Sequence, residues 1–102
     1  YIAGDTVLTP QVTRCVTECR PDVSIVPAGG AAMDFGSELI MDADQVLRLV
    51  GWGDGHFVAN HLEALDHCPT SRVQLQAEAS RRGLASRLSI PEDGETLVFE
   101  LR

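Results

Sequence analysis

The chain has 102 residues, which suits one domain or part of one, and 44% of them are hydrophobic, which excludes a disordered chain on composition. The 15 acidic and 8 basic residues give a formal net charge of −7, so the overall field would repel a phosphate backbone and argues against general nucleic-acid binding. No stretch approaches the roughly 20 apolar residues of a membrane span.

The first third of the chain alternates short apolar runs with a helix pattern. Tyr1–Ala3 is an apolar run that predicts a strand, and a chain that starts within a strand is expected to be a truncation. Thr9 and Pro10 are typical of an N-cap followed by proline in the first turn, and a helical apolar stripe continues until Pro21. Asp22–Val26 is β-branched and apolar, which predicts an interior strand.

The middle of the chain predicts a strand, a helix and another strand. Glu38–Met41 is a short apolar run that predicts a strand. Asp42 then predicts a helix N-cap, with Gln45 as its capping-box partner. After the turn GWGDG, His56–Asn60 predicts a strand that leads directly to His61.

The next segment predicts a helix that begins at Thr70 or Ser71 and ends near Arg82. Gly83 stands where a C-cap glycine belongs. The inner face of this helix is expected to carry three residues, Val73, Ala77 and Ser80.

Two short strands complete the pattern. Leu88–Ile90 and Thr96–Leu101 flank the turn sequence PEDG. Strands that alternate with helices predict an α/β layered fold. Because no repeat or linker interrupts the chain, residues 1–102 are expected to form a single domain.

The cysteines predict a structural role. Cys15, Cys19 and Cys68 are odd in number, and no signal-peptide pattern accompanies them, which argues against a disulfide framework. Their spacing lacks the tight pairs that a zinc site built from cysteines usually needs. We therefore expect them to be small buried hydrophobes in a reducing cytoplasm.

Polar residues follow three of the predicted strands. Asp5 follows the first, Gly29 and Gly30 follow the second, and His61 follows His56–Asn60. In α/β folds such strand ends meet at one crevice, and a carboxylate with an imidazole is a natural pair of ligands for a divalent metal. A catalytic zinc needs at least three protein ligands, so these two residues alone make an incomplete site.

Each candidate also has a structural interpretation. Asp5 and Thr6 can form a turn closed by an Asx hydrogen bond. His61 and His67 bracket the stretch HLEALDH and either serve a metal and a substrate or shape a turn. Glu63 either hydrogen-bonds a ligating imidazole or is solvated.

Several segments resemble the carboxy-terminal half of a metallo-β-lactamase-fold hydrolase, in the branch similar to L-ascorbate-6-phosphate lactonase. They are YIAGDT, DVSIVPAGG, IMDADQVL, HFVANHLEALDHCPTSRVQL and IPEDGETLVF, with GDT and HLEALDHCP the most specific. The resemblance covers nearly the whole chain. The chain lacks the family's H-x-H-x-D-H motif, so we expect it to be a fragment that holds about half of an enzyme.

The resemblance implies a fold and a set of ligands. The fold is a four-layer αββα sandwich of two similar halves, and this chain would supply one half, a mixed sheet with helices on one face. The resemblance makes Asp5 a bridging metal ligand and His61 the last histidine ligand, and it brings His67 and the loop Gly29-Gly30 near the substrate. The implied cofactor is a divalent metal, zinc first, with manganese or iron as alternatives.

The implied activity of the parent protein is hydrolysis of an ester, lactone or phosphoester by a metal-activated water. His67 would protonate the leaving oxygen, while Thr6 and Glu63 would support the ligands. The fragment alone is expected to be inactive, and its uncovered apolar face is expected to self-associate or to pair with the missing amino-terminal half. The alternative is a non-catalytic α/β module that binds a small ligand or a partner.

Overall fold

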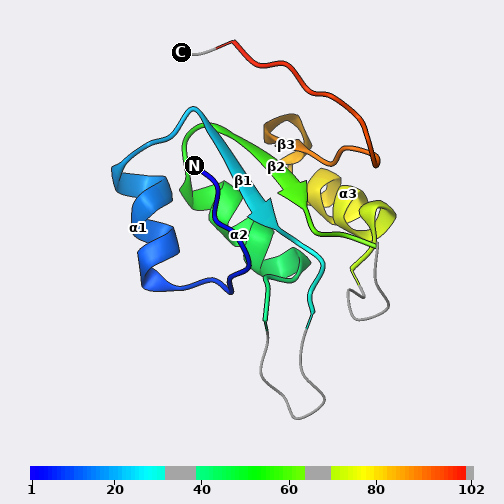
Figure 1. Cartoon of the computed structure of the whole chain (residues 1–102), viewed down its shortest axis with the longest axis horizontal. Helices are drawn as coiled ribbons and strands as arrows, with labels where there is room; N and C mark the ends of the chain where they lie inside the picture. Colours follow the sequence, from blue (N-terminus) through cyan, green and yellow to red (C-terminus); the bar gives the residue numbers. More distant parts are fainter. Residues whose placement is uncertain (32–38, 64–69, 101–102) are drawn as a thin grey trace.

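The structure is a computed structural model that describes residues 1–31, 39–63 and 70–100. It confirms the predicted α/β fold, with helices packed on a small sheet (Figure 1). The elements in chain order are α1 (Pro10–Glu18), β1 (Val23–Pro27), α2 (Ala43–Trp52), β2 (His56–Asn60), α3 (Arg72–Arg81), the 3-10 turn η1 (Ala85–Arg87) and β3 (Leu88–Ser89).

The sheet has the order β1-β2-β3, and its strands are parallel. The register of β1 and β2 runs from Val23 opposite His56 to Pro27 opposite Asn60. The amino-terminal segment joins the other edge of β1 through a parallel bridge between Ile2 and Ile25. A mixed sheet is expected from the resemblance. The described strands are parallel instead, because α2 and α3 carry the chain back between successive strands.

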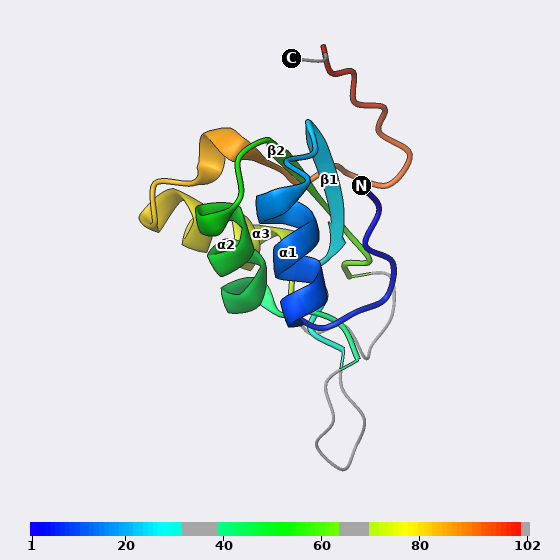
Figure 2. The ribbon, with the colours of Figure 1, turned by 90° about the vertical axis from the view of Figure 1, so that its left-hand side faces the viewer.

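All three helices cover the same face of the sheet (Figure 2). Alternate residues of β1 and β2 point into this layer, which is why Val26, Phe57 and Ala59 are buried while Asn60 is exposed. The main core cluster joins the sheet to the helices and consists of Val12, Val16, Val26, Ala28, Met41, Val46, Leu47, Leu49, Val50, Phe57, Ala59, Leu62, Leu75, Ala79 and Leu88.

The helices begin where their capping residues predict. The Thr9 side chain accepts a hydrogen bond from the backbone of Val12, which caps α1. Asp42 and Gln45 form the predicted reciprocal capping box at the start of α2. Ser71 caps α3 in the same way, and Gly83 follows that helix with a φ of +74°.

Two predicted strands are absent from the described residues. Leu39 and Ile40 donate their amides to the carbonyl of Ala31 and so close a loop instead of joining the sheet; Glu38 lies outside the described residues. The segment 96–100 pairs with no strand and runs away from β3 (Figure 1). An apolar run alone does not place a segment in the sheet, because its backbone must also pair with a neighbouring strand.

The predicted inner face of α3 is wrong. Leu75 and Ala79 are fully buried, whereas Val73 is 78% exposed. Ala77 and Ser80 are also exposed. Leu75 and Ala79 are four residues apart and therefore lie on the same face of α3. This face, and not the face with Val73, packs against the core.

The cysteine prediction is also only partly met. Cys15 is half-buried, but Cys19 is exposed at the end of α1, so it is not a core residue; Cys68 lies outside the described residues. Val12 and Val16 carry the buried stripe of α1 instead.

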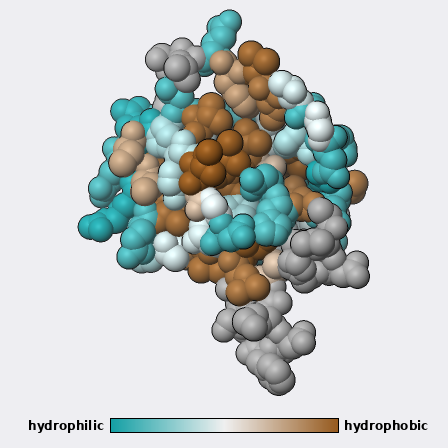
Figure 3. Space-filling view, in the orientation of Figure 1, coloured by the Kyte–Doolittle hydropathy of each residue, from teal (hydrophilic) through white to brown (hydrophobic). Residues whose placement is uncertain are grey.

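The face of the sheet away from the helices is apolar and only partly covered, since Val58 is 8% exposed there. Val23, Ile25 and Val58 line a hollow of about 350 Å³ there, together with Leu97 and Phe99. The space-filling view shows a hydrophobic area at the centre of this face (Figure 3). Within the described part of the chain, no helix has the length and apolar character to cross a membrane.

The shifted stripe of α3 gives a stability prediction. Leu75→Ala empties a fully buried position and is expected to lower the free energy of unfolding by about 2–5 kcal/mol. Val73→Ala, two residues earlier on the same helix, is the matched control and is expected to change it by less than about 0.5 kcal/mol, because Val73 is exposed. Urea denaturation measures both. Equal losses for the two variants would contradict the observed packing of α3.

Candidate active site

Asp5 and His61 meet at the carboxyl edge of the sheet. The Nδ1 atom of His61 lies 2.9 Å from Oδ1 of Asp5, within hydrogen-bonding distance. Asp5 comes from the segment that pairs with β1 through Ile2, and His61 immediately follows β2. The carboxylate side chain is 74% exposed and the imidazole 29% exposed, so the pair is open to solvent. The structure therefore brings together the two residues predicted to be metal ligands.

The loop that carries Gly29 and Gly30 lies at the same edge. The amide of Ala28 donates to the carbonyl of Asn60, the residue before His61. Gly30 has a φ of +72°, and a Cβ there would lie 2.8 Å from Oγ1 of Thr70. The backbone groups of both glycines are used within the fold, since Gly30 donates to Met41 and Gly29 accepts from Thr70. These contacts give a packing reason for the glycines, and their role in substrate binding stays a prediction.

The predicted supporting residues face other partners. The hydroxyl of Thr6 donates to the carbonyl of Val7. Glu63 binds Arg72 through both carboxylate oxygens, so among the described residues its partner is an arginine and not the imidazole of His61. His67 lies outside the described residues, and its proposed catalytic role remains a prediction.

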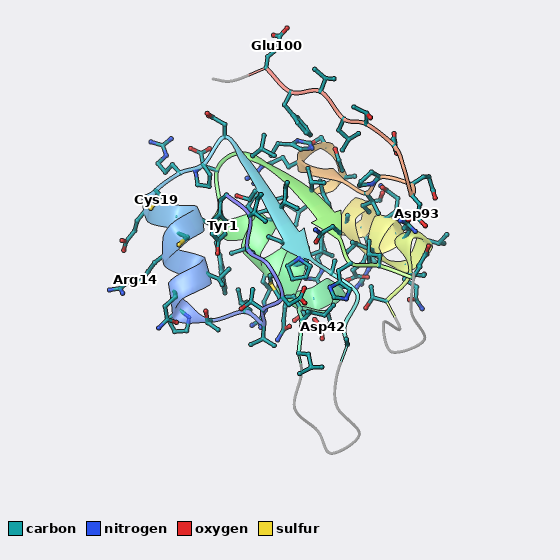
Figure 4. All side chains as sticks on the ribbon, viewed as in Figure 1. Tyr1, Arg14, Cys19, Asp42, Asp93 and Glu100 are labelled. Carbon is teal, nitrogen blue, oxygen red and sulfur yellow. The ribbon has the colours of Figure 1, made fainter. Side chains whose placement is uncertain are left out.

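Arg72 is a residue of this edge that the sequence did not predict. Its backbone amide and Nη1 donate to the two oxygens of Glu63, each over 2.6 Å. Its Nε donates to the carbonyl of Pro91 and its Nη2 to the carboxylate of Asp93, which lies on the turn beside α3 (Figure 4). Arg72, Glu63 and the turn with Asp93 come from three segments that no local sequence pattern connects. Only the tertiary fold shows that they form a cluster.

The cluster changes the titration of its members. Hydrogen bonds from the backbone and then from the side chain of Arg72 hold the pKa of Glu63 below its ordinary value. The hydrogen bond to Glu63 raises the pKa of Arg72. Glu63 is thus kept as a carboxylate at the amino terminus of α3, where the helix dipole also favours a negative charge.

Two hollows flank this cluster. The one that contains His61 has a volume of about 250 Å³ and is lined by Ala59, Asn60, His61, Leu62, Arg72, Pro91, Glu92 and Asp93. A larger one, of about 440 Å³, lies along the outer side of α3 around Val73, Ala77 and Ile90. We place the candidate active site at the smaller hollow, because only this one contains a histidine.

The donor atoms fit part of a divalent metal site. Two ligands of a tetrahedral zinc ion, each about 2.0–2.2 Å from it, lie about 3.3–3.6 Å apart, so the 2.9 Å between Asp5 and His61 would have to widen for both atoms to bind one ion. Among residues 1–31, 39–63 and 70–100, no group of three or more His, Cys, Asp or Glu could hold a metal ion. The described residues thus bring together two donors, fewer than the three protein ligands that a catalytic zinc needs.

His56 has a structural environment at the other end of β2. Its Nε2 lies 2.7 Å from the hydroxyl of Ser89, and its ring packs against Phe99 with centroids 5.1 Å apart. Burial, and secondarily the positive charge of Arg87, lowers the pKa of His56. These contacts give His56 a structural role at the start of β2.

The comparisons with known proteins point to metal-dependent hydrolases. No protein-family model matches the chain. The curated protein UPF0173 protein YddR of Bacillus subtilis is 30% identical over 101 residues, which are 97% of this chain and 39% of that protein. The crystal structure of isothiocyanate hydrolase from Delia radicum gut bacteria is 31% identical, with a TM-score of 0.89 over 97% of this chain and 39% of that one.

Two further solved structures share the fold. A possible metal-dependent hydrolase from Veillonella parvula is 28% identical, with a TM-score of 0.83 over 92% of this chain and 37% of that one. Igni18, a metallo hydrolase from the archaeon Ignicoccus hospitalis, is 25% identical, with a TM-score of 0.75 over 99% of this chain and 41% of that one.

These likenesses define the class of protein. The structural neighbours are hydrolases, and two of them are described as metal-dependent or metallo enzymes. The chain spans about two-fifths of the length of these relatives. It has the fold of a carboxy-terminal part of a metallo-β-lactamase-fold hydrolase, and the resemblance found in the sequence is confirmed.

The environment of His56 predicts an acid-sensitive stability. Because the folded state lowers its pKa from the ordinary 6.5, the unfolded state binds the proton more readily. The free energy of unfolding is therefore expected to fall as the pH is lowered through about 6.5, from about pH 7.5 to about pH 5.5. His56→Gln should show a smaller fall, and the other two histidines, common to both proteins, cancel in the comparison. Urea denaturation at the two pH values measures it, and identical falls would contradict this account.

Proposed function

We propose that this chain supplies half of the metal site of a hydrolase, with Asp5 and His61 as its ligands. The observation that carries the proposal is the approach of Nδ1 of His61 to 2.9 Å from Oδ1 of Asp5, at the carboxyl edge of a parallel sheet. In α/β folds this edge is where ligands bind. The likeness to solved metallo-hydrolases supports a metal there.

The metal is a divalent cation, with zinc preferred and manganese or iron as alternatives. A carboxylate and an imidazole suit all three ions. The chemistry that such an ion supplies when bound is a water nucleophile with a pKa lowered toward neutrality. The other ligands come from outside the described residues, and the resemblance assigns them to the amino-terminal half of the enzyme.

The residues of this chain bind the metal and orient the attacking water. Asp5 and His61 are hydrogen-bonded to each other, and His61 lines the hollow together with Asn60 and Leu62. One oxygen of Asp5 faces the imidazole, and Asp5 would bind or bridge the metal and orient the attacking water. His67 would donate a proton to the leaving atom.

The substrate is a small molecule with an electrophilic centre. Esters, lactones and phosphoesters are the classes implied by the family resemblance. The isothiocyanate hydrolase among the structural neighbours adds isothiocyanates, whose central carbon is also an electrophile.

Substitution of the two ligands tests the proposal in the full-length protein. Asp5→Ala and His61→Ala are each expected to lower zinc affinity by more than about 100-fold, beyond the range seen when a supporting residue is removed. Hydrolysis should be lost with the metal. Competition with a chromophoric chelator measures the affinity, and circular dichroism checks that the fold is kept.

Glu18→Ala is the matched control, because Glu18 is an exposed carboxylate on α1 that faces Arg14. It should leave zinc affinity and activity unchanged. If Asp5→Ala and His61→Ala also leave both unchanged, the alternative is favoured, namely a non-catalytic α/β module that binds a small ligand or a partner at this edge.

We also propose that the face of the sheet away from the helices packs against the rest of the protein. Val23, Ile25 and Val58 lie on this face, and none of the helices among the described residues covers it. An uncovered apolar face of a sheet normally has a partner. The coverage of only 39% of the curated relative supports an amino-terminal half as that partner.

The 102-residue chain by itself is therefore expected to self-associate through this face. Size-exclusion chromatography with light scattering at micromolar concentration should show dimers or larger species. Ile25→Thr should shift the population toward monomer, whereas Val73→Thr, on the outer side of α3, should not. A clean monomer for the unmodified chain would overturn the proposal.

A further inference from the structure

The segment that carries His61 has an unusual backbone. His61 and Glu63 have φ angles of 56° and 60°, in the left-handed region that residues other than glycine rarely adopt. Arg20 is the only other described non-glycine residue with a positive φ. Such conformations are energetically unfavourable and persist only where the surrounding structure holds them.

Two contacts hold this segment in place. Leu62, between the two left-handed residues, is 4% exposed and belongs to the main core cluster. Glu63 is fixed by Arg72, whose backbone amide and Nη1 donate to its two oxygens. The segment is therefore held on the inside by Leu62 and on the outside by the Glu63–Arg72 pair.

Arg72 is itself fixed by further partners. Its side chain is only 16% exposed, and it reaches the carbonyl of Pro91 over 2.8 Å and the carboxylate of Asp93 over 2.7 Å. One guanidinium thus joins three segments, which are the loop after β2, the start of α3 and the turn after β3. A planar group with donors in several directions is required for this, and lysine does not provide it.

We propose that Arg72 is a positioning residue of the site. Through Glu63 it holds the backbone after β2 in the conformation that directs His61 toward Asp5. This inference rests on the proposed function only in taking His61 as a metal ligand. The positioning itself is a property of the chain, and the His61–Asp5 hydrogen bond reports it without a metal.

The chain offers a matched control for a merely structural arginine. Arg87 donates to the carbonyls of Val50, Gly53 and Gly55, and so joins segments near the amino end of β2. Arg72→Met and Arg87→Met each remove a guanidinium with several partners, at opposite ends of the same strand. Both are expected to lower stability, but only Arg72→Met should alter the site.

The experiment uses the full-length protein and two readouts. Zinc affinity, measured by chelator competition, is expected to fall about 10–100-fold in Arg72→Met and in Glu63→Gln, and to stay within twofold in Arg87→Met. Arg72→Lys should not restore it. In the metal-free protein, the ¹⁵N resonances of the His61 ring should shift in Arg72→Met and Glu63→Gln, as its hydrogen bond to Asp5 is lost.

The outcomes separate the two proposals. Unchanged ring resonances of His61 in folded Arg72→Met or Glu63→Gln overturn the positioning role, as does an equal loss of zinc affinity in Arg87→Met. If His61→Ala binds zinc like the wild type, the proposed metal site is wrong, yet the metal-free resonances still decide the positioning role. If Arg72→Met does not fold, Glu63→Gln carries the test, because it keeps the shape of the side chain and removes its charge.

Discussion

The parallel pairing of β1 with β2 is the constraint on which the rest of the structure depends. Because Pro27 lies opposite Asn60, both strands end at the same edge of the sheet. The bridge between Ile2 and Ile25 adds the amino-terminal segment in the same direction. Three stretches of chain far apart in sequence therefore deliver Asp5, the glycine loop and His61 to one place. A one-residue slip of this register would turn the apolar side chains of β2 away from the helices.

The elements with strong local signals could be predicted from the sequence. Thr9, Asp42 and Ser71 begin the three helices because each side chain satisfies a backbone amide that the helix leaves unpaired. The strands β1 and β2 could be predicted because β-branched and aromatic residues occur there in short runs between turn residues. The convergence of Asp5 and His61 followed from the rule that parallel strands end at a common edge.

The remaining features depend on tertiary contacts that no local pattern contains. The apolar runs at 39–41 and 96–100 have the composition of strands, but neither pairs with a strand of the described sheet. The choice of Leu75 over Val73 as the buried residue of α3 depends on how that helix meets α2 and the sheet. Arg72 and Glu63 are nine residues apart, and their pairing becomes evident only when the loop after β2 is seen beside the start of α3.

The central claim is that Asp5 and His61 bind one metal ion in the full-length protein. Its most direct test is a crystal structure of that protein with zinc, with the ion located by anomalous diffraction. We expect a peak at which the Asp5 carboxylate and the His61 imidazole are both within about 2.0–2.2 Å of the ion. A peak at another location, with the direct hydrogen bond between Asp5 and His61 still in place, would contradict the account.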